Sequence, residues 1–233
     1  MSGKLILIPT PIDDESLLCD KTKNMILDAI SNNSMILMEE EKEGRRRWLR
    51  FGLPRECIEN FVIFNEHTQK DLSQSLIKNL KSNQNIILMS DCGLPAFCDP
   101  GTELVNQCHL NNIQVTSAPF GNSIALAISL CGFNHSRFIF EGFIPVQSPE
   151  RQKSLKRILK QKEVSIIMDT PYRLNKLIDE LSNLNCTREV FIGLDLNKPE
   201  ELLLRGSIAK ISKQIEKEKR EFILILGPIN DER

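Results

Sequence analysis

The segment from Met89 to Gly101 has the residue types and spacing of a ligand-binding loop. It follows a short apolar run and holds two glycines, two prolines and two aspartates within thirteen residues. Glycine lets a backbone approach a ligand closely, and the carboxylate of Asp91 accepts hydrogen bonds from hydroxyl or amino groups. The same pattern fits an ordinary turn between a strand and a helix, with Asp99 as helix cap and Pro100 at the first helical position. Both interpretations stay open at this point.

Familiar catalytic and phosphate-binding signatures are absent from the chain. It has no G-x-x-x-x-G-K-[ST] loop, no G-x-G-x-x-G after the first apolar run, no G-x-S-x-G elbow and no H-E-x-x-H. Seven cysteines occur without a C-x-x-C pair, and there are three histidines. These features argue against a disulfide framework or a metal site and favour free thiols in a reducing compartment.

Short apolar runs alternate with segments of helical periodicity. Most of the runs are unbroken, which is typical of strands buried on both faces of a sheet. The predicted strands are Lys4–Pro9, Ser34–Met38, Phe61–Phe64, Asn85–Met89, Ile113–Ser117, Arg137–Glu141, Val164–Asp169, Glu189–Leu194, Glu201–Arg205 and Glu221–Leu226. The predicted helices are Asp14–Ile30, Thr68–Lys81, Thr102–Leu110, Gly121–Cys131, Glu150–Lys162, Tyr172–Leu184 and Ser207–Glu218. This alternation predicts an α/β fold.

A break between two domains is expected at Ser117–Gly121, where Pro and Gly interrupt the pattern. We predict an N-terminal α/β domain of residues 1–117 with a mostly parallel sheet. The C-terminal α/β domain, residues 118–233, is predicted to have a mixed sheet, because two of its late runs are joined by a short connection that favours antiparallel pairing.

Composition narrows the class of protein. The 233 residues include 30 Lys+Arg, 31 Asp+Glu and 41% hydrophobic residues, as in an ordinary globular protein. A net charge of −1 gives no general attraction to polyanions, so any such contact must be a local patch. The N-terminus lacks the pattern of a signal peptide, and the apolar run Ile124–Cys131 is too short to span a bilayer. We expect a soluble cytoplasmic protein with no membrane contact.

Six segments match one set of family motifs in order along the chain. Ser90–Gly101 is similar to S-D-A-G-T-P-x-x-x-D-P-G. The others are Leu7–Ile12 for [VL]-P-T-P-I-G, Pro119–Ile124 for L-P-G-P-S-A, Phe138–Pro145 for F-x-F-x-G-F-L-P, Asp169–Arg173 for E-S-P-H-R, and Asp195–Lys198 with Arg205-Gly206 for E-L-T-K … R-G. Together they resemble the tetrapyrrole methylase superfamily, most closely the branch of bacterial 16S rRNA 2′-O-ribose cytidine methyltransferases.

The resemblance implies a two-domain α/β methyltransferase that binds S-adenosylmethionine in the cleft between its domains, usually as a homodimer through the C-terminal domain. Carried over by position, the cofactor-binding residues are Pro11, Ile12, Asp91, Leu94, Ser123, Ile124, Met168 and Leu194. Adenine needs an apolar slot, and a buried aspartate can take a ribose hydroxyl or the α-amino group. Taken alone, Ile12, Met168 and Leu194 also fit simple core packing.

Departures from the family motifs lie in the substrate half of the site. Asp13 stands where the opening motif has its last glycine. The family's E-D-T-R segment corresponds to Glu39–Glu43, with its acidic pair on Glu40 and Glu41 and its arginine on Glu43, a reversal of charge. Of the histidine-bearing S-x-H-E-H-N-E segment, only the stretch around His67 is left.

The same positions supply the candidate catalytic residues. A ribose 2′-hydroxyl becomes a good nucleophile when a nearby group accepts its proton, and Glu40, Glu41 and His67 are the groups that the motif positions leave for this role. The alternative for the acidic run is a solvated charged loop, and for His67 a residue that caps a helix.

Two basic segments offer contacts to RNA phosphates. Arg46, Arg47 and Arg50 follow the acidic run and are the predicted substrate-binding residues, with Trp48 among them as a candidate for stacking on a base. In Glu150–Lys162, six of thirteen residues are basic. A solvated helix face is the alternative for each segment.

The leading hypothesis is an S-adenosylmethionine-dependent methyltransferase that acts on RNA, at a ribose 2′-hydroxyl of 16S rRNA, without a metal. One alternative is the same chemistry on a small molecule or a protein side chain. Another is a non-catalytic module that binds S-adenosylmethionine or RNA, which the changes at Asp13 and Glu43 keep open.

Overall fold

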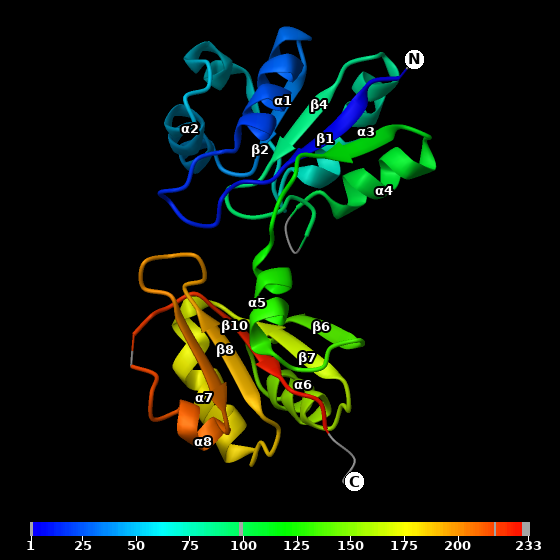
Figure 1. Cartoon of the computed structure of the whole chain (residues 1–233). Helices are drawn as coiled ribbons and strands as arrows, with labels where there is room; N and C mark the ends of the chain where they lie inside the picture. Colours follow the sequence, from blue (N-terminus) through cyan, green and yellow to red (C-terminus); the bar gives the residue numbers. More distant parts are fainter. Residues whose placement is uncertain (1, 98–99, 217, 230–233) are drawn as a thin grey trace. The chain divides into compact units, whose positions relative to one another are not determined.

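The structure, a computed structural model, describes residues 2–97, 100–216 and 218–229 (Figure 1). The chain forms two compact units, residues 1–120 and 121–233, and each is described by itself. Cys98 and Asp99, including the expected helix cap at Asp99, lie outside the described residues.

The first unit is built on a sheet of five parallel strands in the order β3-β2-β4-β1-β5. The strands are β1 (Lys4–Ile8), β2 (Met35–Met38), β3 (Phe61–Ile63), β4 (Ile86–Met89) and β5 (Gln114–Ser117). Every residue of β4, the central strand, is buried, as its unbroken apolar sequence predicts. Because the strands are parallel, the loops that follow them meet at one edge of the sheet, where open α/β sheets bind ligands.

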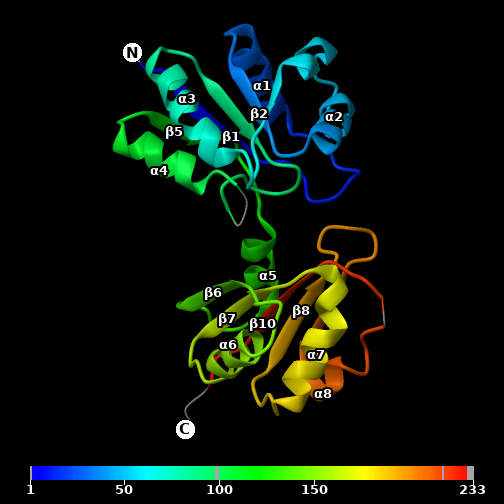
Figure 2. The same cartoon turned by 180° about the vertical axis from the view of Figure 1, so that it is seen from behind.

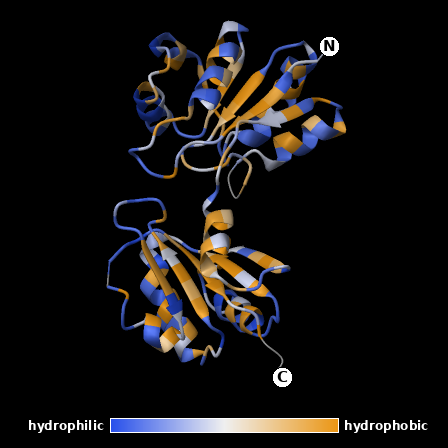
Figure 3. Ribbon diagram, in the orientation of Figure 1, coloured by the Kyte–Doolittle hydropathy of each residue, from blue (hydrophilic) through white to orange (hydrophobic). Residues whose placement is uncertain are grey.

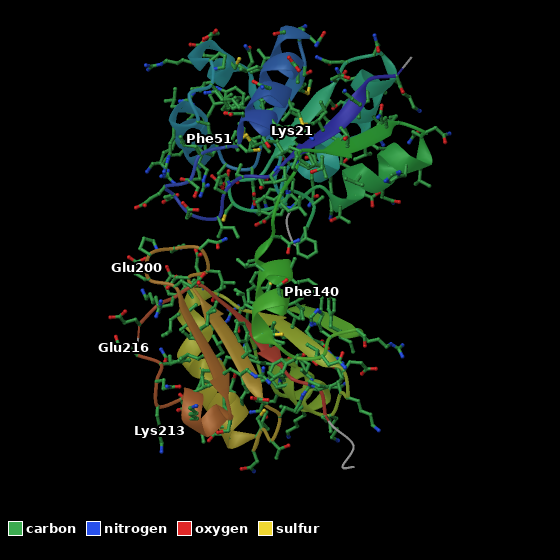
Figure 4. The ribbon with its side chains drawn as sticks, in the orientation of Figure 1. Lys21, Phe51, Phe140, Glu200, Lys213 and Glu216 are labelled. Carbon is green, nitrogen blue, oxygen red and sulfur yellow. The ribbon has the colours of Figure 1, made fainter. Side chains whose placement is uncertain are left out.

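Helices cover both faces of this sheet (Figures 1 and 2). The helices are α1 (Asp20–Ser31), α2 (Glu41–Arg50), the 3₁₀ helix η1 (Arg55–Asn60), α3 (Gln69–Lys81) and α4 (Thr102–Leu110). One core cluster packs α1 and α2 against alternate strand residues such as Ile6 and Ile36. Phe51, at the end of α2, belongs to this cluster (Figure 4). A second cluster packs α3 and α4 against the opposite face, on Leu5 and Leu37.

The second unit contains a mixed five-stranded sheet in the order β6-β7-β10-β8-β9. Its strands are β6 (Phe138–Phe143), β7 (Val164–Met168), β8 (Val190–Leu194), β9 (Leu202–Gly206) and β10 (Phe222–Leu226). Only β6 and β7 pair in parallel, and the other three pairs are antiparallel. The apolar residues lie mainly along these strands and on the inner sides of the helices (Figure 3).

Four α-helices and a 3₁₀ helix complete the described part of the second unit: α5 (Ser123–Cys131), α6 (Glu150–Leu159), η2 (Pro171–Arg173), α7 (Leu174–Asn183) and α8 (Ile208–Ile211). Residues of α5 pack in one core cluster with Ile166, Ile223 and other strand residues. Residues of α6, α7 and α8 pack together in a different cluster, on the other face.

The predicted fold class is confirmed, since both units are α/β, the first with a parallel sheet and the second with a mixed one. Each predicted strand is present, and β8 and β9 pair antiparallel as expected. Three expectations about helices were wrong. The helix predicted over Asp14–Ile30 begins only at Asp20, because the backbone nitrogens of Glu15 and Ser16 donate to the Asp13 carboxylate and hold a turn there. Helix α2 was not expected, because it buries Gly44, Arg47 and Trp48 in place of an aliphatic stripe, and α8 is much shorter than its predicted range.

Candidate active site

Loops after β1 and β4 are joined at the carboxyl edge of the parallel sheet. Thr10 and Gly93 exchange two backbone hydrogen bonds, with N–O distances of 2.9 and 3.1 Å. The Thr10 hydroxyl donates to the carbonyl of Ser90 at 3.1 Å, and the Ser90 hydroxyl donates to the carbonyl of Gly93 at 2.9 Å. These contacts fix the turn that contains Asp91.

Gly93 has the backbone geometry that this turn requires. Its φ of +84° is in the left-handed region, which side chains other than glycine rarely adopt. A Cβ built at Gly93 would meet no atom within 4 Å, so the backbone here borders open space. The turn therefore presents an accessible stretch of main chain beside Asp91, as a ligand-binding loop would.

Asp91 has an enclosed and unsatisfied carboxylate oxygen. Its Oδ1 is buried and has no hydrogen-bond partner in the structure. Burial, and next the negative charge of Glu39, raises the pKa of Asp91 to about 7, although the backbone N–H of Glu40 donates to the carboxylate and opposes the shift. A buried polar atom without a partner costs stability, so it is expected where a ligand completes the bonding.

The acidic run lies at the end of β2, the strand beside β4. The Oε2 of Glu39 accepts a hydrogen bond from the Asp91 backbone nitrogen at 3.4 Å. Glu40 is exposed and precedes the first residue of α2, and Glu41 is the first residue of that helix. The structure thus brings Glu40 to Asp91, whereas the exposed Glu41 forms an ion pair with Arg45 at 3.1 Å.

His67 lies in the loop after β3, the neighbour of β2 on the other side. Its side chain is 83% exposed, and its Nε2 is 3.6 Å from a carboxylate oxygen of Glu66. The loop is ordered by Asn65, whose Oδ1 accepts from the backbone nitrogens of His67 at 3.0 Å and Thr68 at 3.2 Å. Asn65 also donates to the Glu39 carbonyl at 3.4 Å, so this loop and the acidic run are adjacent.

The arginines of α2 are engaged in an ion-pair cluster with Asp14 and Glu43. Arg46 contacts Asp14 at 2.6 Å and also pairs with Glu43. Arg47 is buried and donates to the Pro11 carbonyl at 2.7 Å and to Glu43 at 3.1 Å. Arg50 is partly exposed. The cluster ties α2 to the loop after β1.

The expectation that Trp48 stacks on a base was wrong. Its side chain is fully buried, its indole nitrogen donates to the Pro54 carbonyl at 2.8 Å, and its ring meets Phe61 edge-on at 5.1 Å between centroids. Trp48 is a core residue that anchors α2.

The two departures that introduce a negative charge, Asp13 and Glu43, are accommodated locally. Slight burial raises the pKa of Asp13, but hydrogen bonds from Ser16 and Glu15 lower it by more, so the pKa lies below its ordinary value. The same hydrogen bonds to the carboxylate fold the loop after β1. A hydrogen bond from Arg46, with a second from Arg47, likewise lowers the pKa of Glu43. The negative charge at Glu43 is therefore paired within the protein.

In the second unit, the four residues expected at the cofactor lie at strand ends and a helix start. Ser123 and Ile124 begin α5, where the Asn122 side chain caps the helix by accepting from the Ala125 nitrogen at 2.8 Å. Met168 and Leu194 end β7 and β8 and pair with the first two residues of β10. Met168 is partly exposed, whereas Leu194 is buried in the core.

A buried ionic network that the sequence did not reveal lies beside Met168. Asp169 is fully buried and accepts from Arg151 at 2.9 Å and from the Arg173 Nε at 2.6 Å. Arg151 also donates to Glu180 at 2.7 Å and to the Pro145 carbonyl at 3.1 Å. The network joins α6 and α7 to the ends of β6 and β7.

Comparison with known proteins identifies the family. The model of the tetrapyrrole (corrin/porphyrin) methylases matches residues 4–212, which is most of the chain. The chain belongs to the tetrapyrrole methylase family. It is therefore a methyltransferase whose methyl donor is S-adenosylmethionine, as the motifs predicted.

Two curated relatives of this tetrapyrrole methylase match almost all of its length. The ribosomal RNA small subunit methyltransferase I of Thermotoga maritima is 29% identical over 223 residues, which are 93% of this chain and 94% of that protein. The protein of the same name from Vibrio cholerae is 30% identical over 232 residues, covering 97% and 78%. The uroporphyrin-III C-methyl transferase of Thermus thermophilus, solved in complex with S-adenyl homocysteine, shares the fold, with a TM-score of 0.58 at 17% identity and 97% of each chain covered.

The loops at the carboxyl edge of the parallel sheet in the first unit offer groups suited to S-adenosylmethionine. S-adenosylmethionine presents ribose hydroxyls and an α-amino group, and the unsatisfied Oδ1 of Asp91 is an acceptor suited to either. Pro11, Ile12 and Leu94 are partly exposed around the same turn and would offer apolar contact. The individual cofactor-binding and catalytic assignments remain predictions.

The described residues contain neither a membrane-spanning helix nor a metal-binding cluster. No helix in ranges 2–97, 100–216 and 218–229 is long and apolar enough to cross a membrane. Within the same ranges, no group of three or more His, Cys, Asp or Glu residues is arranged to hold a metal ion.

Proposed function

We propose that this methyltransferase acts on ribosomal RNA of the small subunit, at a ribose 2′-hydroxyl of a cytidine. The observation that carries this proposal is the match along 93% and 97% of the chain to two proteins named ribosomal RNA small subunit methyltransferase I. The motif resemblance supports a ribose hydroxyl as the acceptor.

The carboxyl edge of the parallel sheet supplies the groups that the reaction needs. S-adenosylmethionine, when bound, supplies a methyl group activated on a sulfonium. Asp91 would hold the donor by accepting a hydrogen bond at Oδ1, and the backbone of Gly93 would allow close approach. Methyl transfer is an in-line displacement that depends chiefly on alignment, so this positioning is a major part of catalysis.

Proton removal from the acceptor hydroxyl is assigned to the acidic run or to His67. Among these candidates we favour Glu40, because it is exposed and its backbone nitrogen contacts the Asp91 carboxylate. In this proposal a Glu40 carboxylate oxygen accepts the proton of the ribose hydroxyl as the oxygen–carbon bond forms. Of the predicted substrate-binding residues on α2, Arg46 and Arg50 are proposed to face the RNA. Arg47 is buried and would instead hold the helix against the loop after β1.

We also propose that the protein works as a cytoplasmic homodimer. Support comes from β6, an edge strand of the second unit's sheet, where Phe138 and Phe143 are 48% and 49% exposed. Exposed apolar side chains on an edge strand, which pairs on one side alone, favour association with another surface. Light scattering after gel filtration should give twice the mass of the chain, and a monomer mass would contradict the proposal.

Transfer to ribosomal subunits tests the proposed acceptor. Small ribosomal subunits that lack the modification should gain label from methyl-labelled S-adenosylmethionine. Ribonuclease treatment should release that label, and protease treatment should not. Label that follows the protein fraction would favour a protein acceptor, and transfer only to small molecules would favour the other alternative.

A further inference from the structure

The exposed face of α6 carries a cluster of basic side chains outside the site described above. An open depression of about 560 Å³ lies on this face. Its lining residues are Pro149, Gln152, Lys153, Lys156, Arg157 and Lys160. The inner face of the same helix is occupied by Arg151, Leu155 and Ile158, which are buried. The helix is therefore fixed by its core side and presents its lysines to solvent.

Among the described residues, no ion pair or hydrogen bond involves the side chains of Lys153, Lys156 or Lys160. Arg157 differs from the three lysines, because it forms an ion pair with Glu141, whose side chain is 5% exposed. Glu150, in the first turn, is the exposed acidic residue of the helix. Three lysine charges on one face thus remain uncompensated.

The arginines of α2 contrast with these lysines. Arg45, Arg46 and Arg47 all pair with acidic side chains, and Arg47 is buried. A phosphate would have to replace those pairs, at a cost in free energy that lysines without partners do not incur. On charge alone, the α6 face is the better phosphate-binding surface.

The α6 face also begins beside a predicted cofactor residue. Arg151 donates to Pro145 at the end of β6 and to Asp169, which directly follows Met168. Lys153 is two residues further along the helix, and Lys160 lies roughly 10 Å beyond Lys153 along the axis at the helical rise of 1.5 Å per residue. The lysines therefore form a row that starts at the edge of the sheet where Met168 ends β7.

We infer that the α6 face binds the phosphate backbone of the RNA substrate, through Lys153, Lys156 and Lys160 with Gln152 as a neutral hydrogen-bonding group. This inference rests on the proposed function. RNA suits the face because lysine ammonium groups neutralise phosphates and an amide can bond to phosphate or sugar. A lipid surface suits it less, because the apolar side of α6 is packed in the core and offers nothing for insertion.

The test replaces all three lysines with glutamine and measures binding to unmodified small ribosomal subunits over a series of salt concentrations. The log–log salt slope should fall by roughly 2 to 3 in magnitude if three contacts are lost, at about 0.7–0.9 for each. Affinity for S-adenosylhomocysteine and the melting temperature should stay unchanged, which shows that the protein is folded. The single variant Lys156→Gln should give about one third of the change in slope.

The matched control replaces Lys176, Lys210 and Lys213 of the same unit, which changes the net charge equally (Figure 4 labels Lys213). An equal effect of both triple variants would reduce the result to total charge and overturn the inference, as would an unchanged slope in the α6 variant. Vesicles of phosphatidylserine and phosphatidylcholine are the second probe. Vesicle binding that depends on the three lysines, with RNA binding unaffected, would also overturn it.

Failure of this inference can be separated from failure of the proposed function. If the wild-type protein methylates small-subunit RNA and the α6 variant binds it equally well, only the inference about α6 is wrong. If the wild-type protein transfers no methyl group to this RNA and does not bind it, the proposed function is wrong and the inference falls with it.

Discussion

At the residue scale, Asp91 shows the conflict between folding and binding most clearly. Its Oδ1 is enclosed without a partner, and its pKa is raised to about 7 by burial and by Glu39. Between the ordinary pKa of 3.8 and about pH 7, the folded protein holds a proton here that the unfolded chain has lost. Stability therefore falls as the pH rises through this window, and the loss stays constant above it.

Asp91→Asn should raise the melting temperature while it weakens binding. At pH 8 the amide removes the cost of a buried charge, whereas near pH 4 both side chains are neutral and the two proteins should melt at similar temperatures. Affinity for S-adenosylhomocysteine should drop by about 1–3 kcal/mol, the range of a hydrogen bond to a charged group. Scanning calorimetry and titration calorimetry measure the two effects. A variant with lower stability and unchanged affinity would make Asp91 a structural residue of the turn.

The pH dependence of binding provides a second test of Asp91. A hydroxyl or amino group of the ligand donates to the ionised carboxylate, so affinity should rise with pH up to about 7 and level off above it. Just below that pH, the dissociation constant should change by up to about tenfold for each pH unit, until the affinity reaches that of the protein with a neutral Asp91. Asp91→Asn is the matched control and should remove this dependence. A wild-type affinity that is flat between pH 5.5 and 8 would contradict the assignment.

Glutamine variants of Glu40 and Glu41 should differ in their rate of methyl transfer to RNA. Glu40→Gln should lower transfer to RNA by about 10²–10⁴-fold, because the amide cannot accept the proton. Glu41→Gln should change transfer little, since Glu41 pairs with Arg45 in the first turn of α2. Single-turnover kinetics with bound RNA measures both. Equal rates for wild type and Glu40→Gln would exclude Glu40 as the base, and His67→Gln would then be compared in the same assay.

Sequence reasoning found Asp91 because the motif around it is dense in Gly, Pro and Asp. It did not find the contact of Asp91 with Glu39, because that contact depends on β2 and β4 being neighbours. Strand order is set by packing of the whole sheet and is not written in the local pattern. The Arg151–Asp169 network was missed for the same reason.

At the element scale, α2 links the acidic run to the loop after β1. Gly44 makes its close packing possible, since a Cβ there would lie 3.3 Å from Met38 on β2. Arg47 reaches from the same helix to the carbonyl of Pro11. The position of Pro11, a predicted cofactor-binding residue, thus depends on α2, the helix that contains the predicted substrate-binding arginines.

Arg47→Ala and Arg46→Ala should differ in their effect on stability. Removal of the buried Arg47 takes away the hydrogen bond to the Pro11 carbonyl and one of the two arginines that pair with Glu43, and should cost about 1.5–3 kcal/mol. Arg46 is an exposed member of its ion pairs, so its loss should change the free energy of unfolding little. Urea unfolding measures both. Equal costs would show that the cluster does not hold α2 on the loop.

The elements themselves were largely predictable because their patterns are strong. Unbroken apolar runs indicated most of the strands, since strands buried on both faces need no alternation. Helix α2 was not predicted, because its buried residues are Gly44, Arg47 and Trp48, which do not form an apolar stripe at helical spacing. Helix α8 was overestimated, because Ile208 and Ile211 make only one turn of contact with the core.

At the scale of the whole molecule, the near-zero net charge requires that any RNA contact be local. The chain has 30 basic and 31 acidic residues, so long-range attraction to RNA is weak and the placement of individual basic groups decides binding. Binding to RNA should accordingly show a modest salt slope that depends on a few lysines and arginines.

One measurement tests the central claim most directly. Unmodified small subunits are incubated with the protein and S-adenosylmethionine that carries a deuterated methyl group, and the RNA is digested to nucleosides for mass spectrometry. We predict deuterated 2′-O-methylcytidine at about one per subunit with wild-type protein, and far less with Asp91→Ala at limiting donor concentration. Deuterium on a base, on protein or nowhere in the subunit would contradict the assignment of this chain as a ribose methyltransferase of the small subunit.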